Sequence, residues 1–322
     1  MFRAVASSPP AQVSSPDHAG LHFYSSSGGN AGLACATSAA ALGRPATIVV
    51  PLPTPAHMVA KLQALGAEVI LAGRDWPAAD AYLRAHFLAG APGSSNSSGG
   101  GASAAAAAVY VPPFDHPDIW AGAASLVEEL APHFPPGAAD AAGRLHGIVC
   151  SVGGGGLLCG VMEGVGRVYG GRSGEGEGGA APPPRVLAVE TAGADSLHAS
   201  VRAGELVTLA AITSVATSLG ARRVAGRALE WALRPGGGVV SAVVSDADAV
   251  AAVARFLDEA RFLVEPACGA TIAPVYNGDL RRYLGEGLSD GEWATRNVVL
   301  VVCGGSNISL EMLVGYQQRF GV

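Results

Sequence analysis

Short apolar runs alternate with longer segments of helical periodicity along the chain from residue 21 onward. Runs rich in Val, Ile, Leu and Ala predict buried strands at residues 22–24, 46–50, 68–71, 109–111, 147–150, 186–189, 239–244 and 298–302. Apolar residues three or four positions apart predict helices at residues 33–42, 55–65, 76–88, 120–130, 157–165 and 246–259, and two more that begin near 263 and 308. Strands that alternate with helices in this way are typical of a parallel α/β sheet.

One junction between a strand and a helix has an unusual composition. Residues 151–160 read SVGGGGLLCG, so that four glycines stand between the strand at 147–150 and the helix at 157–165. Glycine lacks a Cβ, which lets the backbone turn tightly and bring several N–H groups to an anion at the helix N-terminus. The alternative is a flexible linker, but a linker between two strongly apolar elements is costly, and phosphate binding is favoured. The GxxxxGK[ST] pattern is absent, which favours a small phosphate ester over a nucleoside triphosphate.

Three segments lack periodic apolar positions. Residues 1–20 are rich in Ser, Ala and Pro and are predicted to form a disordered leader. Residues 90–108 and 170–184 are rich in Gly together with Ser, Ala or Pro, which predicts two surface insertions outside the core.

Length and charge limit the classes of protein to which the chain can belong. It has 322 residues, of which 49% are hydrophobic and 14% are charged, and its formal net charge is −6. This length is sufficient for two domains with separate cores. The acidic balance argues against nucleic acid and against an anionic lipid surface as partners. No run of about 18 strongly apolar residues occurs, so no membrane span is predicted.

The cysteines indicate a reducing compartment. They form no CxxC pair and lie mostly within apolar runs, at Cys35, Cys150, Cys159, Cys268 and Cys303. Reduced thiols in an intracellular protein are therefore predicted, rather than disulfides or a zinc site. We expect a cytoplasmic protein; the leader, rich in Ser and Ala and poor in acids, leaves an organelle as the alternative.

Three turns that follow predicted strands are rich in small residues: SSGGNAG at 26–32, SVGGGG at 151–156 and CGGSN at 303–307. Open α/β sheets bind ligands at the carboxyl ends of their strands, so these turns are candidates for one common site. Further motifs are YVPPFDHPDIWAG, VETAGADS, ITSVATSLGA and VEPACGA. With these segments the chain resembles, from about residue 21 to its end, the serine/threonine dehydratases, fold-type II enzymes that depend on pyridoxal phosphate (PLP).

The resemblance implies an α/β fold with two domains, each built on a mostly parallel sheet flanked by helices. The smaller domain, at residues 21–120, would carry the substrate loop and would be incomplete. The larger domain, at residues 121–322, would bind the cofactor. A homodimer that acts on a small amino-acid substrate is implied as well.

The resemblance also implies roles for individual residues. The cofactor phosphate would be held by Gly153, Gly154, Gly155, Gly156 and Leu157. The substrate carboxylate would be bound by the hydroxyls and amides of Ser26, Ser27 and Gly28. Asn30 would bind the ring hydroxyl of the cofactor, and Cys303 would face its pyridine nitrogen.

A monovalent cation is part of the same resemblance. Its ligands would be the Glu190 carboxylate and the backbone carbonyls of Gly153, Ala194, Leu219 and Ala221. Ligation by oxygen alone favours a hard cation, and K+ is expected.

The implied reaction is the conversion of L-serine to pyruvate and ammonia, with L-threonine to 2-oxobutanoate as a second activity. A thiol at Cys303 cannot keep the ring nitrogen protonated as an aspartate would, so the ring is a weaker electron sink. This suits β-elimination, in which the departing hydroxyl relieves the carbanion. Gly28 has no side chain that could move a proton on the second face of the substrate, which favours elimination over racemisation.

The sequence departs from the family at the lysine that carries the cofactor. The family places this lysine in an SFK-type motif some tens of residues before the SSGGN loop, where it forms a Schiff base and takes the α-proton. This chain has one lysine, Lys61, in the helix predicted at 55–65, where a solvent-facing position is expected. Two hypotheses follow. The favoured one is a lyase whose N-terminal segment is missing from this sequence, and the other is a non-catalytic PLP-binding or interaction protein.

Overall fold

The computed structural model describes residues 20–89, 107–138, 140–141, 143–170, 182–236 and 238–322. The chain divides into two compact units, Met1–Pro113 and Phe114–Val322. Residues 1–19 of the predicted leader and most of the two predicted insertions lie outside the described residues. None of the described helices combines the length and the apolar character that crossing a membrane requires.

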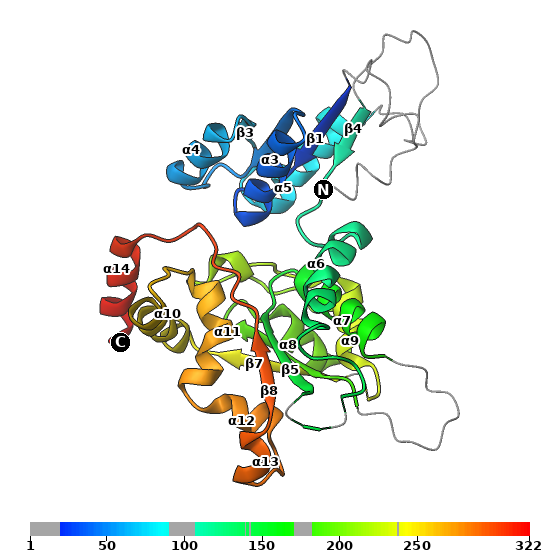
Figure 1. Cartoon of the computed structure of the whole chain (residues 1–322). Coiled ribbons are helices and arrows are strands. Elements are labelled where there is room, and N and C mark those ends of the chain that lie inside the picture. Colours follow the sequence, from blue (N-terminus) through cyan, green and yellow to red (C-terminus); the bar gives the residue numbers. More distant parts are fainter. Residues whose placement is uncertain (1–19, 90–106, 139, 142, 171–181, 237) are drawn as a thin grey trace. The chain divides into compact units, whose positions relative to one another are not determined.

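The first unit is built on a four-stranded parallel sheet in the order β3-β2-β1-β4 (Figure 1). Its strands are β1 (Leu21–Ser25), β2 (Ala46–Val50), β3 (Glu68–Leu71) and β4 (Ala107–Tyr110). Its helices are α3 (Asn30–Ala41), α4 (Ala56–Ala64), α5 (Trp76–Leu83) and the π-helical turn η1 (Arg84–Leu88). The parallel α/β sheet that the alternation predicted is confirmed here.

Apolar helices cover both faces of this sheet. Ile48 and Val49 are neighbours in β2 and fully buried, yet they belong to different clusters because successive strand residues point to opposite faces. Ile48 packs in one cluster with Leu62 of α4, and Val49 packs in the other with Leu83 of α5. Burial on both faces explains why β2 is an unbroken apolar run.

The second unit is built on another four-stranded parallel sheet, in the order β7-β6-β5-β8 (Figure 1). Its strands are β5 (Leu145–Ser151), β6 (Arg185–Thr191), β7 (Val239–Val244) and β8 (Asn297–Leu300). Its larger helices are α6 (Pro117–Leu130), α7 (Gly156–Val168), α10 (Asp246–Ala260), α11 (Pro266–Tyr276) and α14 (Leu310–Phe320). The shorter ones are α8 (Ser196–Ala203), the 3-10 turn η2 (Thr217–Leu219), α9 (Gly226–Leu233), α12 (Asp279–Leu284) and α13 (Asp290–Ala294).

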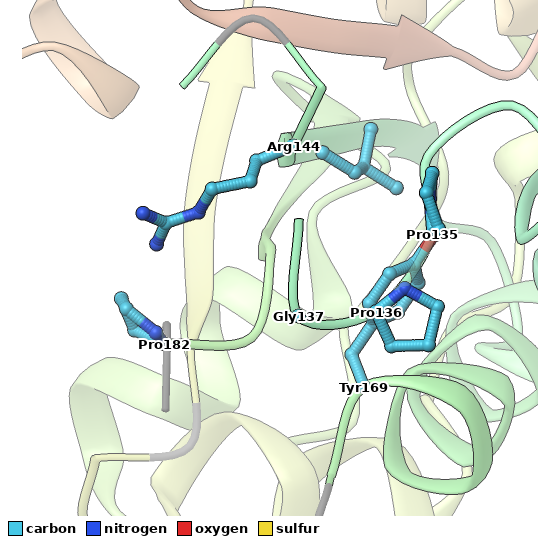
Figure 2. Close-up of a pocket in the computed structure, with 7 residues that line it drawn as sticks. Pro135, Pro136, Gly137, Arg144, Tyr169 and Pro182 are labelled. Atoms are coloured by element: carbon cyan, nitrogen blue, oxygen red, sulfur yellow. The ribbon is translucent and has the colours of Figure 1, made fainter. Parts of the chain in front are cut away.

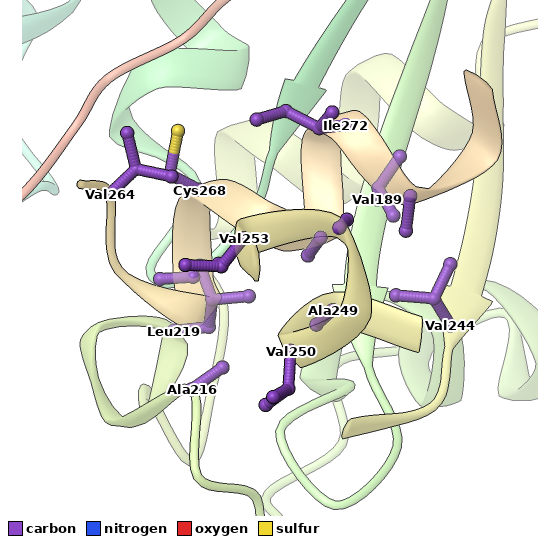
Figure 3. Close-up of a cluster of buried hydrophobic side chains, with 14 of the residues drawn as sticks. Val189, Ala216, Leu219, Val244, Ala249, Val250, Val253, Val264, Cys268 and Ile272 are labelled. Atoms are coloured by element: carbon purple, nitrogen blue, oxygen red, sulfur yellow. The ribbon is translucent and has the colours of Figure 1, made fainter. Parts of the chain in front are cut away.

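Two hydrophobic clusters stabilise the second unit. In one of them, Ile148 of β5 packs with Leu158 of α7. In the other, Val189 of β6 packs with Val253 of α10 and Ile272 of α11 (Figure 3). The second sheet is therefore also covered by helices on both faces, as the apolar runs of its strands predict.

Most predicted elements are present with shifted ends. Helix α3 begins at Asn30 rather than at residue 33, because the SSGGN loop runs directly into the helix with Gly29 at its N-cap. The single helix predicted at 76–88 is α5 followed by η1. Strand β8 ends at Leu300, since the next residues already form the turn that leads to Cys303.

Candidate functional site

The turn between β5 and α7 contains the four consecutive glycines. Strand β5 ends at Ser151, and Gly155 is the N-cap residue of α7 in a left-handed conformation with φ +90°, which is strained for any residue with a side chain. A Cβ on Gly154 would overlap the Phe114 ring, and one on Gly156 would lie 2.8 Å from the Phe114 carbonyl oxygen. Close packing against Phe114 therefore requires glycine. No side chain caps the first N–H groups of α7.

The Cys303 turn follows the strand next to β5. Strands β5 and β8 are parallel neighbours, in which Val149 pairs with Leu300 and its carbonyl oxygen accepts a hydrogen bond from the Val301 amide at 2.9 Å. Both strands end within two residues of this pair. The glycine loop and the Cys303 turn therefore leave the sheet side by side, from the same edge.

Cys303 differs from the other four cysteines in its exposure. Its side chain is exposed, whereas Cys35, Cys150, Cys159 and Cys268 are buried. The protein around the Cys303 sulfur nevertheless removes enough water to raise the pKa of the thiol to about 11, with a smaller contribution from Cys268. The thiol is therefore protonated at neutral pH.

Glu265 anchors the Cys303 turn, a role that the sequence pattern did not predict. One carboxylate oxygen accepts a hydrogen bond from the Asn307 amide at 2.6 Å, and the other accepts one from the Ser218 hydroxyl. These partners are 42 and 47 positions away in the sequence, so no local pattern predicts them. The available signal was a lone acid within the apolar segment LVEPACGA.

Glu190, the predicted cation ligand, is fully buried in β6. Its carboxylate accepts hydrogen bonds from the backbone amides of Leu197 at 2.8 Å and His198 at 2.7 Å, in the first turn of α8. Burial raises the pKa of Glu190 to about 8, and the two backbone hydrogen bonds only partly oppose this rise.

The other predicted cation ligands lie in neighbouring loops of the same unit. Gly153 lies against Leu219, since a Cβ on Gly153 would be 3.1 Å from the Leu219 Cα. The Leu219 carbonyl accepts a hydrogen bond from the Ala221 amide at 2.8 Å, and the Ala194 amide donates to the Thr191 carbonyl at 2.8 Å. The described residues include no group of three His, Cys, Asp or Glu side chains that could hold a metal ion, and the predicted set consists mainly of backbone carbonyls.

In the first unit, the predicted substrate loop connects β1 to α3 and rests on Asp80 of α5. The buried Ser26 hydroxyl donates to an Asp80 carboxylate oxygen at 2.7 Å. The Tyr110 hydroxyl donates to the same oxygen at 2.6 Å, and Arg84 donates to the other at 2.7 Å. The hydroxyl proton of Ser26 is thus used within the protein.

The protonation states of Asp80 and Tyr110 follow from their burial and from these hydrogen bonds. Burial alone would raise the pKa of Asp80, but the hydrogen bonds from Arg84, Tyr110 and Ser26 outweigh it and leave that pKa below its usual range. Burial, reinforced by the Asp80 carboxylate, raises the pKa of Tyr110 to about 12. Asp80 is therefore ionised and Tyr110 protonated at neutral pH.

The remaining loop residues have different surroundings. The Ser27 hydroxyl accepts a hydrogen bond from the Gly29 amide at 3.3 Å. A Cβ on Gly28 would lie 2.8 Å from the Thr54 methyl group, so a side chain at Gly28 would require Thr54 to move. Asn30 is the first residue of α3.

Lys61 lies in the last turn of α4 and is half-buried. Helix α4 starts after the carboxyl end of β2 and ends before the amino end of β3. Its last turn is therefore near the amino ends of the strands, whereas the Ser26–Gly29 loop follows the carboxyl end of β1.

A small hollow in the second unit is separate from these turns. Figure 2 shows it between loop prolines and side chains that include Arg144 and Tyr169. Leu145, which also lines it, is the first residue of β5, whereas the glycine loop follows the last residue of that strand. The hollow therefore lies at the opposite end of β5 from the candidate site.

Comparisons with known proteins agree with these features. The sequence model of the family described as "Pyridoxal-phosphate dependent enzyme" matches residues 11–304. "Serine dehydratase-like" from Homo sapiens is 45% identical over 302 residues, which cover 93% of this chain and 80% of that protein. "L-serine dehydratase/L-threonine deaminase" from Bos taurus is 43% identical over 304 residues, which cover 94% and 81%. The crystal structure of a fungal L-serine ammonia-lyase from Rhizomucor miehei superposes with a TM-score of 0.73 at 32% identity, covering 94% of this chain and 82% of that one.

Proposed function

Because the chain belongs to the fold-type II pyridoxal-phosphate-dependent enzymes and is close to the serine dehydratases, we propose that it binds PLP and deaminates L-serine to pyruvate and ammonia. L-threonine, which would give 2-oxobutanoate, is the proposed second substrate. One observation carries the proposal. The glycine loop and the Cys303 turn leave adjacent strands at the same edge of one sheet, where open α/β sheets bind ligands.

The residues present fit the cofactor. The glycine loop offers uncapped N–H groups at the start of α7 to a phosphate, with Gly153, Gly154, Gly155, Gly156 and Leu157 as the proposed binding residues. Cys303 is exposed and neutral, so its thiol can face a pyridine nitrogen without protonating it. PLP supplies the electron sink that loss of the α-proton requires.

In the first unit we assign the substrate loop to the amino-acid carboxylate and Asn30 to the ring hydroxyl of the cofactor. The Ser26 hydroxyl is directed to Asp80, so backbone amides and Ser27 remain as the proposed carboxylate donors. Gly28 offers no proton-transfer group, which supports elimination rather than racemisation.

The proposed K+ site has electrostatic support. The buried Glu190 carboxyl has a raised pKa, so its ionised form gains from a nearby positive charge. A K+ ion held by Glu190 and the carbonyls of Gly153, Ala194, Leu219 and Ala221 would provide that charge.

One observation favours a second candidate function, a protein that binds PLP without reacting it. Lys61 is the one lysine of this sequence, and it lies near the opposite edge of its sheet from the substrate loop. Lys61 is therefore poorly placed to hold the cofactor covalently.

Borohydride reduction tests whether this chain holds PLP covalently. The purified chain would be mixed with PLP, reduced and analysed by absorbance and intact mass, beside a pyruvate assay with L-serine and a Lys61→Arg control. A covalent adduct together with pyruvate formation supports the lyase, and loss of both in Lys61→Arg would identify Lys61 as its lysine. Saturable PLP binding without an adduct or pyruvate fits the second candidate and also a lyase whose lysine lies in a segment missing from this sequence. An in-frame segment with an SFK-type motif in the coding DNA upstream of Met1 would then favour the lyase. Absence of PLP binding would overturn both.

A further inference from the structure

Glu265 has a buried carboxylate whose hydrogen bonds lie outside the helix that follows it. It precedes α11 and is only 3% exposed, but its side chain does not cap that helix. Its two oxygens instead accept hydrogen bonds from the Asn307 amide and the Ser218 hydroxyl. The carboxylate therefore joins two segments that are distant in sequence.

The first of these segments is the Cys303 turn, which the chain around Glu265 holds at several points. The Glu265 amide donates to the Gly304 carbonyl at 2.8 Å. The Gly304 amide donates to the Cys268 sulfur at 3.4 Å. A Cβ on Gly305 would overlap the Glu265 carboxyl group. The path of the turn thus depends on where the Glu265 side chain lies.

The second segment is the loop at residues 213–221, which lies against the glycine loop. A Cβ on Gly153 would be 3.1 Å from both the Ser218 carbonyl oxygen and the Leu219 Cα. Leu219 also packs in the same hydrophobic cluster as Val264 and Cys268 (Figure 3). These two residues precede and follow Glu265 in the sequence. Glu265 therefore connects the surroundings of the glycine loop to the Cys303 turn.

A carboxylate suits this role because both of its oxygens accept hydrogen bonds. A glutamine has almost the same shape, but its NH2 group cannot accept a hydrogen bond. If its carbonyl oxygen accepts from the Asn307 amide, the Ser218 hydroxyl has to turn and accept from the NH2 group. Hydrogen bonds to an ionised group are stronger than those between neutral groups. Replacement by glutamine should therefore weaken both hydrogen bonds, and with them the connection between the two segments, without changing the volume of the side chain.

We propose that Glu265 is a positioning residue that fixes the distance between the Cys303 turn and the glycine loop, so that one PLP molecule contacts both. This inference rests on the proposed function for the identity of the ligand. The position of the turn itself can be measured without any ligand.

Alkylation of Cys303 by iodoacetamide measures that position, since Cys303 is the exposed cysteine of the five. Its rate would be followed by peptide mass spectrometry, without and with PLP, and PLP affinity would be measured by equilibrium dialysis. Glu265→Gln is compared with Asp246→Asn. Asp246 anchors the same loop at its other end, accepting from the Ser214 hydroxyl at 2.5 Å and the Val215 amide at 3.0 Å.

In Glu265→Gln we expect the ligand-free alkylation rate of Cys303 to change at least about 10-fold and PLP affinity to fall at least about 10-fold. Asp246→Asn should change both by less than about 3-fold, although both variants lower the melting temperature. Equal effects of the two variants on Cys303 and on PLP would overturn the positioning role. If Glu265→Gln does not fold, Ser218→Ala replaces it, with an expected loss of PLP affinity of about 5-fold; an unchanged affinity would overturn the role.

Failure of the proposed function has a different result. The unmodified chain would then show neither PLP binding nor protection of Cys303 by PLP. If it does bind PLP and protect Cys303 while Glu265→Gln behaves like the unmodified chain, the positioning role alone is wrong.

Discussion

Asp80 determines, at the scale of single residues, how the substrate loop is held. Its carboxylate accepts hydrogen bonds from Ser26, Tyr110 and Arg84. Asp80→Asn leaves at least one of these donors without an acceptor. We expect the free energy of unfolding of the first unit to fall by about 1–3 kcal/mol, and any stabilisation of the chain by L-serine to weaken. Denaturant titrations with and without L-serine measure both effects.

Asp75→Asn is the matched control in the same helix. Asp75 caps α5 by accepting from the Ala78 amide at 3.0 Å, and asparagine caps helices equally well. This variant should therefore stay within about 0.5 kcal/mol of the unmodified chain. If the Asp80→Asn variant is as stable as the Asp75→Asn variant, Asp80 does not hold the substrate loop through these hydrogen bonds.

The raised pKa of Cys303 gives a second residue-scale prediction. With a pKa of about 11, only about one thiol in a thousand is ionised at pH 8, and the thiolate is the reactive form. The rate of Cys303 alkylation should therefore rise about tenfold per pH unit from pH 7 to pH 10 without reaching a plateau. Cys303→Ser measures the background from the buried thiols. A plateau near pH 8.5–9, the range of an ordinary thiol, would show that the sulfur is not desolvated.

At the scale of the element, Gly155 at the N-cap of α7 and Gly166 within that helix have contrasting environments. Gly155 has φ +90°, and a Cβ there would lie 2.7 Å from the Ala228 Cβ. Gly155→Ala should therefore lower the free energy of unfolding by about 2–4 kcal/mol. Gly166 is exposed within the same helix with open space beside it, so Gly166→Ala should raise that free energy by about 0.5–1 kcal/mol.

Thermal unfolding of the two alanine variants tests this contrast. Their melting temperatures should move in opposite directions. A Gly155→Ala variant as stable as Gly166→Ala would mean that the glycine loop does not need its left-handed residue.

The elements that the sequence predicted are those whose signal is local. The apolar residues of β2 are consecutive, and so are the glycines before α7, so each pattern can be recognised within a short stretch of sequence. Short helices such as α12 and α13 have too few turns to show an apolar face. The π-helical turn η1 continues the pattern of α5, so nothing in the periodicity marks the change.

At the scale of the whole molecule, the arrangement of the site depends on contacts that no local pattern contains. The glycine loop and the Cys303 turn could each be predicted as a strand-end turn, but their adjacency depends on the pairing of β5 with β8, the last strand of the chain. The same limit applies to Asp80, whose partner Ser26 is 54 positions away. The turns are therefore predictable from the sequence, whereas Asp80 and Glu265, the carboxylates that hold them, are not.

Glu190 gives a prediction for the stability of the whole chain. Its pKa is about 8 in the folded protein, against an ordinary value of 4.5, so between these pH values the folded state binds more protons than the unfolded state. The free energy of unfolding should therefore decrease as the pH rises from about 4.5 to 8, by on the order of 3–5 kcal/mol from this group, and its contribution should level off above pH 8. Glu190→Gln cannot ionise, so this part of the pH dependence should disappear.

Glu190→Gln also loses one acceptor for the Leu197 and His198 amides, so we expect it to be less stable at pH 5 by about 1–3 kcal/mol. The pH dependence, rather than the absolute stability, is thus the decisive measurement.

Repeating the denaturant titrations with K+ and with the bulky tetramethylammonium ion extends the test to the proposed cation. A K+ ion beside Glu190 favours the carboxylate and lowers its pKa, so K+ should stabilise the unmodified chain increasingly above pH 6 and should have no such effect on Glu190→Gln. If stability depends on pH in the same way in the two salts, K+ does not bind beside Glu190. The Glu190 carboxyl then only accepts hydrogen bonds from the first turn of α8.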